Sequence, residues 1–216
     1  EYFLLEAKSL AKLSAVPEIV HIRTYFQANG TAYIVMEYIT GMPLHKYVMN
    51  RGYRISMKET LAILQPVMEA LARVHDANLI HRDISPDNIM LTPNGKVKLL
   101  DFGAARYVEN ADAEHDRNTS TQAILKHGFA PPEQYRSHGA LGPWTDVYAI
   151  CATIYYCLTG RVPVDAVSRS PREGHPDWQS IPGLTMRQRA ALEKGMSVLA
   201  KDRFPSVAEL AAELYA

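Results

Sequence analysis

Apolar side chains recur with helical spacing in two parts of this chain. Between residues 57 and 76 they follow one another at intervals of three and four, a pattern that predicts one long amphipathic helix. Leucines among charged residues before Pro17 predict a shorter helix that stops at this proline. Residues 147–158 are largely apolar, and because a membrane span needs roughly 20 such residues, they predict a buried helix instead.

Short apolar runs predict strands around these helices. The candidate strands are residues 21–27, 31–38, 78–80, 89–91 and 97–100. The first two are joined across Asn29-Gly30, which is a strong hairpin signal. The turn residues Pro93-Asn94-Gly95 separate the last two and predict a second, smaller hairpin.

The second half of the chain combines a long polar connection with further helices. Residues 101–133 contain few apolar side chains and many Asp, Asn, Thr and Ser residues, which predicts a connection without regular structure. A connection of this length is usually a functional loop. After Pro143 the pattern is largely helical, interrupted by a loop over residues 160–183.

Composition narrows the class of protein. The 216 residues include 23 basic and 23 acidic side chains, and the resulting net charge of zero removes nucleic-acid binding as the default function. A hydrophobic share of 47% is typical of a globular protein. Cys151 and Cys157 are too far apart along the predicted buried helix to form a disulfide, so we expect a reduced, intracellular protein. No signal peptide is visible, and the missing initiator Met suggests a fragment.

The most informative residues are the string from His81 to Asn88, HRDISPDN, and the later Asp101-Phe102-Gly103. Each piece alone is common, because an Asp in a loop is usually a turn former or a helix cap. Together they have a chemical logic. Phosphoryl transfer needs a carboxylate that orients the attacking hydroxyl, and oxygen ligands that hold Mg²⁺ against the phosphates. Asp83 can supply the first, and Asn88 with Asp101 can supply the second.

These motifs resemble those of eukaryotic-type (Hanks-type) protein kinases, which also occur in bacteria. The family pattern H-R-D-x-x-x-x-N matches residues 81–88, and D-F-G matches residues 101–103. Three further matches follow in family order: Pro131-Pro132-Glu133 in place of A-P-E, Asp146-Val147-Tyr148, and Lys201-Asp202-Arg203-Phe204. The resemblance covers nearly the whole chain.

The resemblance implies an α+β, two-lobed, protein-kinase-like fold. Residues 1–39 would be a remnant of the small lobe, containing the αC helix, two strands and the hinge. Residues 40–216 would be the complete, mainly helical large lobe, with an activation segment at residues 101–133. Only five residues precede Glu6, the match to the αC glutamate, so the chain as given has no room for the Gly-rich loop or the β3 lysine. We therefore expect this chain alone to bind ATP poorly and to be nearly inactive.

The resemblance also implies roles for individual residues. Asp83 would be the catalytic residue that orients the attacking hydroxyl or deprotonates it as a general base, and Asn88 and Asp101 would be the Mg²⁺ ligands. The nucleotide site would include Glu6, Glu37, Ile39, Met90, Asn88 and Asp101. Structural roles would fall to His81, Phe102, Glu133, Asp146 and Arg203, with Glu133 and Arg203 forming an ion pair and Asp146 holding the catalytic loop through backbone amides.

Two positions depart from the family pattern. Ser/Thr kinases usually carry a Lys two residues after the catalytic Asp and a Thr before A-P-E, whereas this chain has Ser85 and Lys126 there. We therefore expect Lys126 to reach the γ-phosphate while the Ser85 hydroxyl takes the hydrogen-bonding role near Asp83, which keeps one positive charge at the reacting group. The alternative is that Lys126 is a solvated loop charge and the kinase is weakened.

The polar connection also suggests regulation. Thr119, Ser120 and Thr121 lie in its middle, and Arg82 is the family's candidate partner for a phosphate there. The alternative is that three hydroxyl residues in a polar loop have no special role.

The sequence thus predicts transfer of the ATP γ-phosphate to Ser or Thr of a protein substrate, with ATP and Mg²⁺ as cofactors. The competing function is that of a pseudokinase, a folded scaffold that binds proteins without phosphoryl transfer. We expect no nucleic-acid partner and no membrane segment within this chain, with an anchor outside it left open. The expected location is the cytoplasm, or the cytoplasmic domain of a membrane-anchored kinase.

Overall fold

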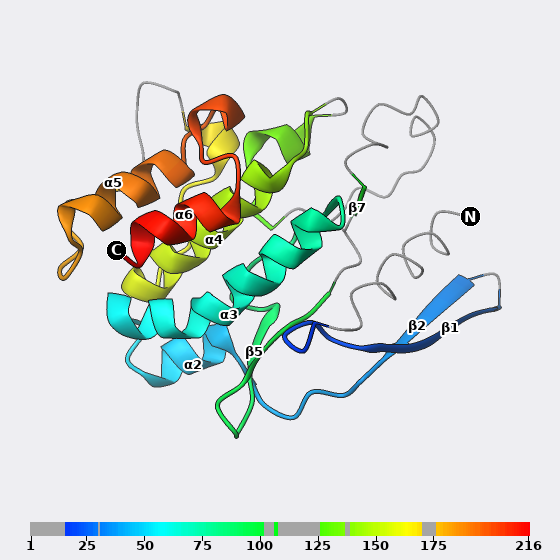
Figure 1. Ribbon diagram of the computed structural model, residues 1–216. Coiled ribbons are helices and arrows are strands. Elements are labelled where there is room, and N and C mark those ends of the chain that lie inside the picture. The colour runs from blue at the N-terminus through cyan, green and yellow to red at the C-terminus, as the bar shows by residue number, and fades with distance from the viewer. Residues whose placement is uncertain (1–15, 30, 102–105, 108–125, 137–138, 170–175) are drawn as a thin grey trace.

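The β1–β2 hairpin stands apart from a cluster of helices (Figure 1). The computed structural model describes residues 16–29, 31–101, 106–107, 126–136, 139–169 and 176–216. Strand β1 (Ile22–Ala28) pairs antiparallel with β2 (Thr31–Met36), as the Asn29-Gly30 signal predicted. Asn29 has a φ of 52°, a left-handed conformation that suits a tight hairpin turn.

Helix α4 (Pro143–Thr159) is the centre of the helical part and packs against α3 (Met57–Asp76), α5 (Met186–Gly195) and α6 (Val207–Leu214). It is buried on nearly all sides, which explains why its sequence is apolar without a clear stripe. Helix α3 begins where Ser56 accepts a hydrogen bond from the Glu59 main-chain nitrogen at 3.2 Å. Both helices confirm the predictions from hydrophobic pattern.

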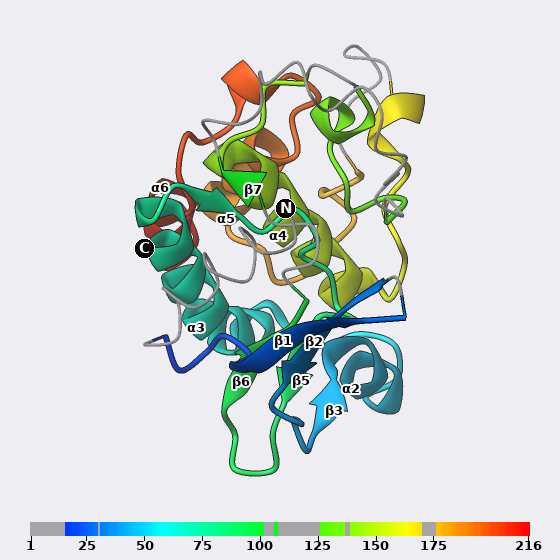
Figure 2. The ribbon, with the colours of Figure 1, turned by 90° about the vertical axis from the view of Figure 1, so that its right-hand side faces the viewer.

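The structure has two further small sheets, and Figure 2 shows that the strands of the first lie beside the β1–β2 hairpin, whereas β7 of the second lies near the helices. The first has the order β3-β5-β6, formed by β3 (Met42–Pro43), β5 (Ile89–Leu91) and β6 (Val97–Leu99). The second pairs β4 (Leu79–Ile80) with β7 (Arg106–Tyr107). The β5–β6 hairpin confirms the prediction from Pro93-Asn94-Gly95.

One helix was missed, one sequence expectation needs correction, and another falls outside the described residues. Helix α2 (Leu44–Asn50) was not predicted. Residues 101–133 are not wholly irregular, because they contain β7 and the start of a 3₁₀ helix, Pro132–Tyr135. The helix expected before Pro17 lies outside the described residues.

Among the described residues, the remaining elements are two short 3₁₀ helices, Ala166–Ser168 and Ala200–Asp202. Cys151 and Cys157 are buried in α4 and free, and burial raises the pKa of both thiols. Within the described part of the chain, no helix combines the length and the apolar character needed to cross a bilayer.

Candidate active site

The β5–β6 hairpin brings Asn88 and Asp101 to the same place. Asn88 directly precedes β5, and Asp101 follows β6 after one residue. The Leu100 main-chain nitrogen donates to the Asn88 carbonyl oxygen at 2.8 Å, which extends the pairing beyond the strands. Asp101 has a φ of 58°, a left-handed backbone conformation that is uncommon for a residue other than glycine. Two residues that are distant in sequence are therefore neighbours at one end of the hairpin.

Asp83 joins this pair through Asn88. The Asn88 amide nitrogen donates to the Asp83 carboxylate oxygen Oδ2 and to the Asp83 carbonyl oxygen, each at 2.8 Å. Burial raises the pKa of Asp83, and the nearby Asp101 charge adds to this, whereas Lys126 and the Asn88 hydrogen bond oppose it. The Asp101 effect has this sign because a neighbouring negative charge disfavours the ionised form of Asp83.

The same contacts define which atoms could hold a divalent cation. Both bonds to Asp83 use the amide nitrogen of Asn88, which leaves the amide oxygen as the atom able to act as a ligand. The Asp101 residue is exposed. An amide oxygen and carboxylate oxygens suit Mg²⁺, which takes few protein ligands and completes its shell with water and phosphate oxygens. Among the described residues, no group of three or more His, Cys, Asp or Glu is placed to bind a metal.

Asp146 on α4 holds the first residues of the loop of residues 81–88 through hydrogen bonds. Its carboxylate accepts hydrogen bonds from the main-chain nitrogens of His81 and Arg82, both at 2.9 Å, and lies 2.7 Å from Nε2 of His75. Burial alone would raise the pKa of Asp146, but the hydrogen bond and charge of His75 and these contacts outweigh it and lower the pKa. Arg82 has a φ of 70°, a strained conformation that the Asp146 bond helps to hold.

His81 has a structural role and does not act as a proton carrier. It is fully buried, its Nε2 lies 3.1 Å from the Leu100 carbonyl oxygen, and its Nδ1 accepts from the Asp83 main-chain nitrogen at 3.3 Å. Burial lowers its pKa, so the ring is neutral at neutral pH. His81 thereby ties the loop of residues 81–88 to the chain just before Asp101.

Lys126 and Ser85 meet, although 41 positions separate them. The Lys126 ammonium donates to the Ser85 hydroxyl oxygen at 2.8 Å and lies 2.8 Å from the Asp87 carboxylate. Ser85 is fully buried, whereas the Lys126 side chain is 31% exposed. The positive charge of Lys126 therefore stands at the edge of the site, near Asp83.

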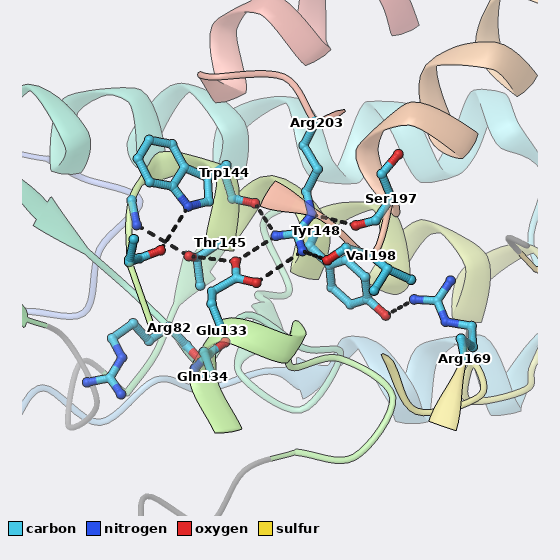
Figure 3. Close-up of polar contacts among 12 residues, drawn as sticks. Arg82, Glu133, Gln134, Trp144, Thr145, Tyr148, Arg169, Ser197, Val198 and Arg203 are labelled. Atoms are coloured by element: carbon cyan, nitrogen blue, oxygen red, sulfur yellow. Dashed lines mark hydrogen bonds and ion pairs between the residues drawn. The ribbon is translucent and has the colours of Figure 1, made fainter. Parts of the chain in front are cut away.

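Glu133 and Arg203 form a buried, bidentate ion pair (Figure 3). The two guanidinium nitrogens lie 2.6 and 3.1 Å from the two carboxylate oxygens, and Thr145 donates to the same carboxylate at 3.1 Å. The next residue, Gln134, donates to the Arg82 carbonyl oxygen at 2.9 Å. The segment that ends the polar connection is therefore fixed to both the C-terminal helices and the loop of residues 81–88.

Two of the residues expected near a nucleotide, Glu37 and Met90, are linked through Lys98. Lys98 of β6 donates to the Glu37 carboxylate at 2.6 Å, and Met90 is the cross-strand partner of Lys98, so both project from the same face of the hairpin. Burial would raise the pKa of Glu37, but the hydrogen bonds from Lys98 and the His21 main chain lower it. Ile39 follows β2 and is partly exposed.

Several expected residues lie outside the described part of the chain. These are Glu6, Phe102, Thr119, Ser120 and Thr121.

The sequence reasoning did not assign roles to His75, Asp87, Gln134 and Thr145, which all contact the site. Their partners lie far along the chain, for example 71 positions between His75 and Asp146. Two local signals could have drawn attention to some of them: Asp87 lies inside the string of residues 81–88, and His75 lies near the end of a predicted helix.

Comparison with known proteins gives a consistent result. A family model described as "Protein kinase domain" matches residues 1–201. Serine/threonine-protein kinase PknA of Mycobacterium tuberculosis is 37% identical over 169 residues, which are 76% of this chain and 37% of that protein. Serine/threonine-protein kinase PrkC of Bacillus subtilis is 35% identical over 167 residues, which are 77% of this chain and 24% of that protein.

A solved structure described as "PpkA-294 apo form" aligns with a TM-score of 0.77 at 29% identity, covering 98% of this chain and 73% of that chain. The chain thus spans well under half the length of the two curated relatives.

Proposed function

The chain belongs to the protein kinase family, with bacterial serine/threonine kinases as relatives and the α+β kinase fold, and we propose that its protein transfers the γ-phosphate of ATP to a Ser or Thr hydroxyl of a protein substrate. The observation that carries this proposal is the meeting of Asp83, Asn88 and Asp101 at one end of the β5–β6 hairpin.

Asp83 is the proposed catalytic base. The substrate oxygen forms a bond to the γ-phosphorus while the bond from that phosphorus to the bridging oxygen breaks, which leaves ADP, and the hydroxyl proton passes to the Asp83 carboxylate. A pKa raised by burial makes this carboxylate a stronger base than an ordinary Asp. The bond from Asn88 keeps the carboxylate oriented.

Asn88 and Asp101 are the proposed Mg²⁺ ligands. Mg²⁺, when bound, would neutralise charge on the phosphates. The proposed adenine site consists of the chain at Glu37 and Ile39, with Met90 on the hairpin face below. The Glu37 carboxylate is already held by Lys98 and the Glu37 main-chain nitrogen donates to the His21 carbonyl oxygen, so the rest of the main chain of this segment is the part proposed to contact a nucleotide.

Lys126 supplies the positive charge that the family usually carries two residues after the catalytic Asp. Its 2.8 Å bond to Ser85 supports the exchange of the two positions, because the ammonium reaches the place from which the missing lysine would act. Lys126→Ala should lower the turnover rate by about 10²- to 10³-fold. A rate within about twofold of wild type would favour a solvated loop charge instead. The control is Lys201→Ala, because Lys201 is also a lysine and is exposed.

Phosphorylation of Thr119, Ser120 or Thr121 is the proposed regulation, with Arg82 as the partner of the phosphate. Mass spectrometry of the active enzyme should find phosphate on at least one of these residues. An unmodified segment in fully active protein would contradict this.

The main experiment measures phosphate transfer by the natural full-length protein. Wild type should transfer label from γ-labelled ATP to a protein substrate only with Mg²⁺. Asp83→Asn should lower the rate by about 10²- to 10⁴-fold, because it removes the base and keeps an acceptor for Asn88. Asp202→Asn, an exposed residue, is the matched control and should be unaffected.

Failure of wild type to transfer phosphate would favour the pseudokinase alternative. Since the reaction uses ATP, we place the protein in the cytoplasm, or this part of it on the cytoplasmic side of a membrane. The proposed partner is a protein substrate.

A further inference from the structure

Asp87 has no part in the function proposed above, yet its carboxylate contacts two other elements. One oxygen, Oδ2, lies 2.8 Å from the Lys126 ammonium, and the other, Oδ1, lies 2.7 Å from Nδ1 of His45. Asp87 belongs to the loop of residues 81–88, Lys126 to the segment before Glu133, and His45 to the first turn of α2. The carboxylate is therefore the point at which three separate parts of the chain meet.

Lys126 needs such a contact because a lysine side chain does not hold one position by itself. Its ammonium is a point charge on a flexible stem with three rotatable donors. The Ser85 hydroxyl supplies one acceptor and Asp87 supplies a second, both at 2.8 Å and both from the same loop. Two acceptors define the ammonium position far better than one.

His45 limits the freedom of Asp87 in turn. The His45 main-chain nitrogen donates to the Pro86 carbonyl oxygen at 3.1 Å, which fastens the start of α2 to the residue before Asp87. The His45 ring lies close to the carboxylate but lacks the alignment of a directed hydrogen bond, so it restrains Asp87 by contact and through the main-chain bond to Pro86.

Asp87 and Lys126 are partly exposed, so their contact is suited to positioning the ammonium rather than to stabilising the fold. The Asp87 side chain is 50% exposed and that of Lys126 is 31% exposed. Ion pairs at such positions contribute little to stability, because water screens the charges. A misplacement of about 1 Å at a reacting group can nevertheless lower a rate 10²-fold.

We propose that Asp87 is a positioning residue that holds the Lys126 ammonium against Ser85 in the geometry needed for phosphoryl transfer, with His45 restraining the Asp87 carboxylate. This inference rests on the proposed function, specifically on the role of Lys126. It assigns Asp87 an effect on the rate that acts entirely through Lys126.

A double-mutant cycle in the natural full-length protein tests this dependence. Asp87→Ala should lower kcat about 10- to 100-fold, leave the KM for ATP within about twofold, and leave the unfolding midpoint unchanged. In a Lys126→Ala background, the same substitution should change kcat by less than about twofold. Asp202→Ala removes an exposed carboxylate elsewhere and should have no effect in either background.

A second measurement does not depend on catalysis. The protein is treated with a limiting amount of an acylating reagent, and mass spectrometry measures how much of Lys126 and of Lys201 is acylated. Relative to Lys201, Lys126 should react at least about threefold faster in Asp87→Ala than in wild type, because one of its two fixed acceptors has been removed. His45→Ala should accelerate the reaction less.

The outcomes separate the two ideas. The positioning role is wrong if Asp87→Ala lowers kcat equally in both backgrounds, if it leaves kcat within about twofold of an active wild type, or if the labelling of Lys126 does not change. If wild type transfers no phosphate while the labelling of Lys126 responds to Asp87→Ala, the proposed function fails and the positioning contact stands. If Lys126→Ala leaves the rate unchanged, the role of Lys126 fails and the positioning role fails with it.

Discussion

Replacing Arg203 by Met should destabilise the whole helical part of the protein. The Arg203 side chain is fully buried and donates to five oxygen atoms: both carboxylate oxygens of Glu133 and the carbonyl oxygens of Trp144, Ser197 and Val198. Methionine has a similar length but no donor. Arg203→Met therefore leaves the Glu133 carboxylate buried, with only the Thr145 hydroxyl as a partner in the described structure.

The expected loss is about 3–5 kcal/mol, the usual effect of removing one partner from a buried ion pair. For a chain of this size, each kcal/mol lowers the unfolding midpoint by about 2–4 °C, so the midpoint should fall by about 6–20 °C. Urea unfolding followed by circular dichroism gives the free energy directly. The loss should be larger than that of Glu133→Gln, which keeps an acceptor for the guanidinium.

Arg187→Met is the matched control. Arg187 also pairs with a glutamate, Glu213, at 2.7 Å, but the two side chains are 53% and 40% exposed. Because water screens this pair, the control should leave the unfolding midpoint almost unchanged. The reasoning would be refuted if Arg203→Met and Arg187→Met gave the same midpoint, or if Arg203→Met lost less than about 1 kcal/mol.

Three further predictions concern the site and its supports. In kinase assays, Lys126→Thr should be nearly inactive, and adding Ser85→Lys should restore activity by re-creating the usual family arrangement; no recovery would contradict the exchange. The contacts of Asp146 with His75 and the loop lower its pKa, so they contribute stability that is present above the ordinary pKa of 3.8 and is lost as pH falls through the lowered value. Urea titrations should therefore show that the difference in unfolding free energy between wild type and Asp146→Asn closes in that acid range. Gly128→Ala should destabilise the protein in thermal unfolding by about 1–2 kcal/mol or more, because Gly128 has a φ of 81° and the new Cβ would lie 2.5 Å from a main-chain oxygen; an unchanged midpoint would show that the segment adapts.

The elements around the site show which secondary structure the local hydrophobic pattern predicts and which it misses. Helix α3 was predicted from apolar spacing, which recurs over 20 residues and therefore carries a clear period. Helix α2 was missed because its seven residues bury only Leu44 and Val48, too few to display a period. Strand β7 has two residues and exists only because β4 lies beside it.

The sequence by itself determined the family, the long helices and the candidate roles of Asp83, Asn88 and Asp101, because each rests on residues close together in the chain or on motifs in a fixed order. Only the tertiary structure decided that Lys126 is shared between Ser85 and Asp87 and that His75 supports Asp146. The physical reason is that hydrogen bonds and ion pairs depend on distances of about 3 Å between atoms. Such distances between residues 39 to 71 positions apart are set by how the elements pack, which local spacing does not encode.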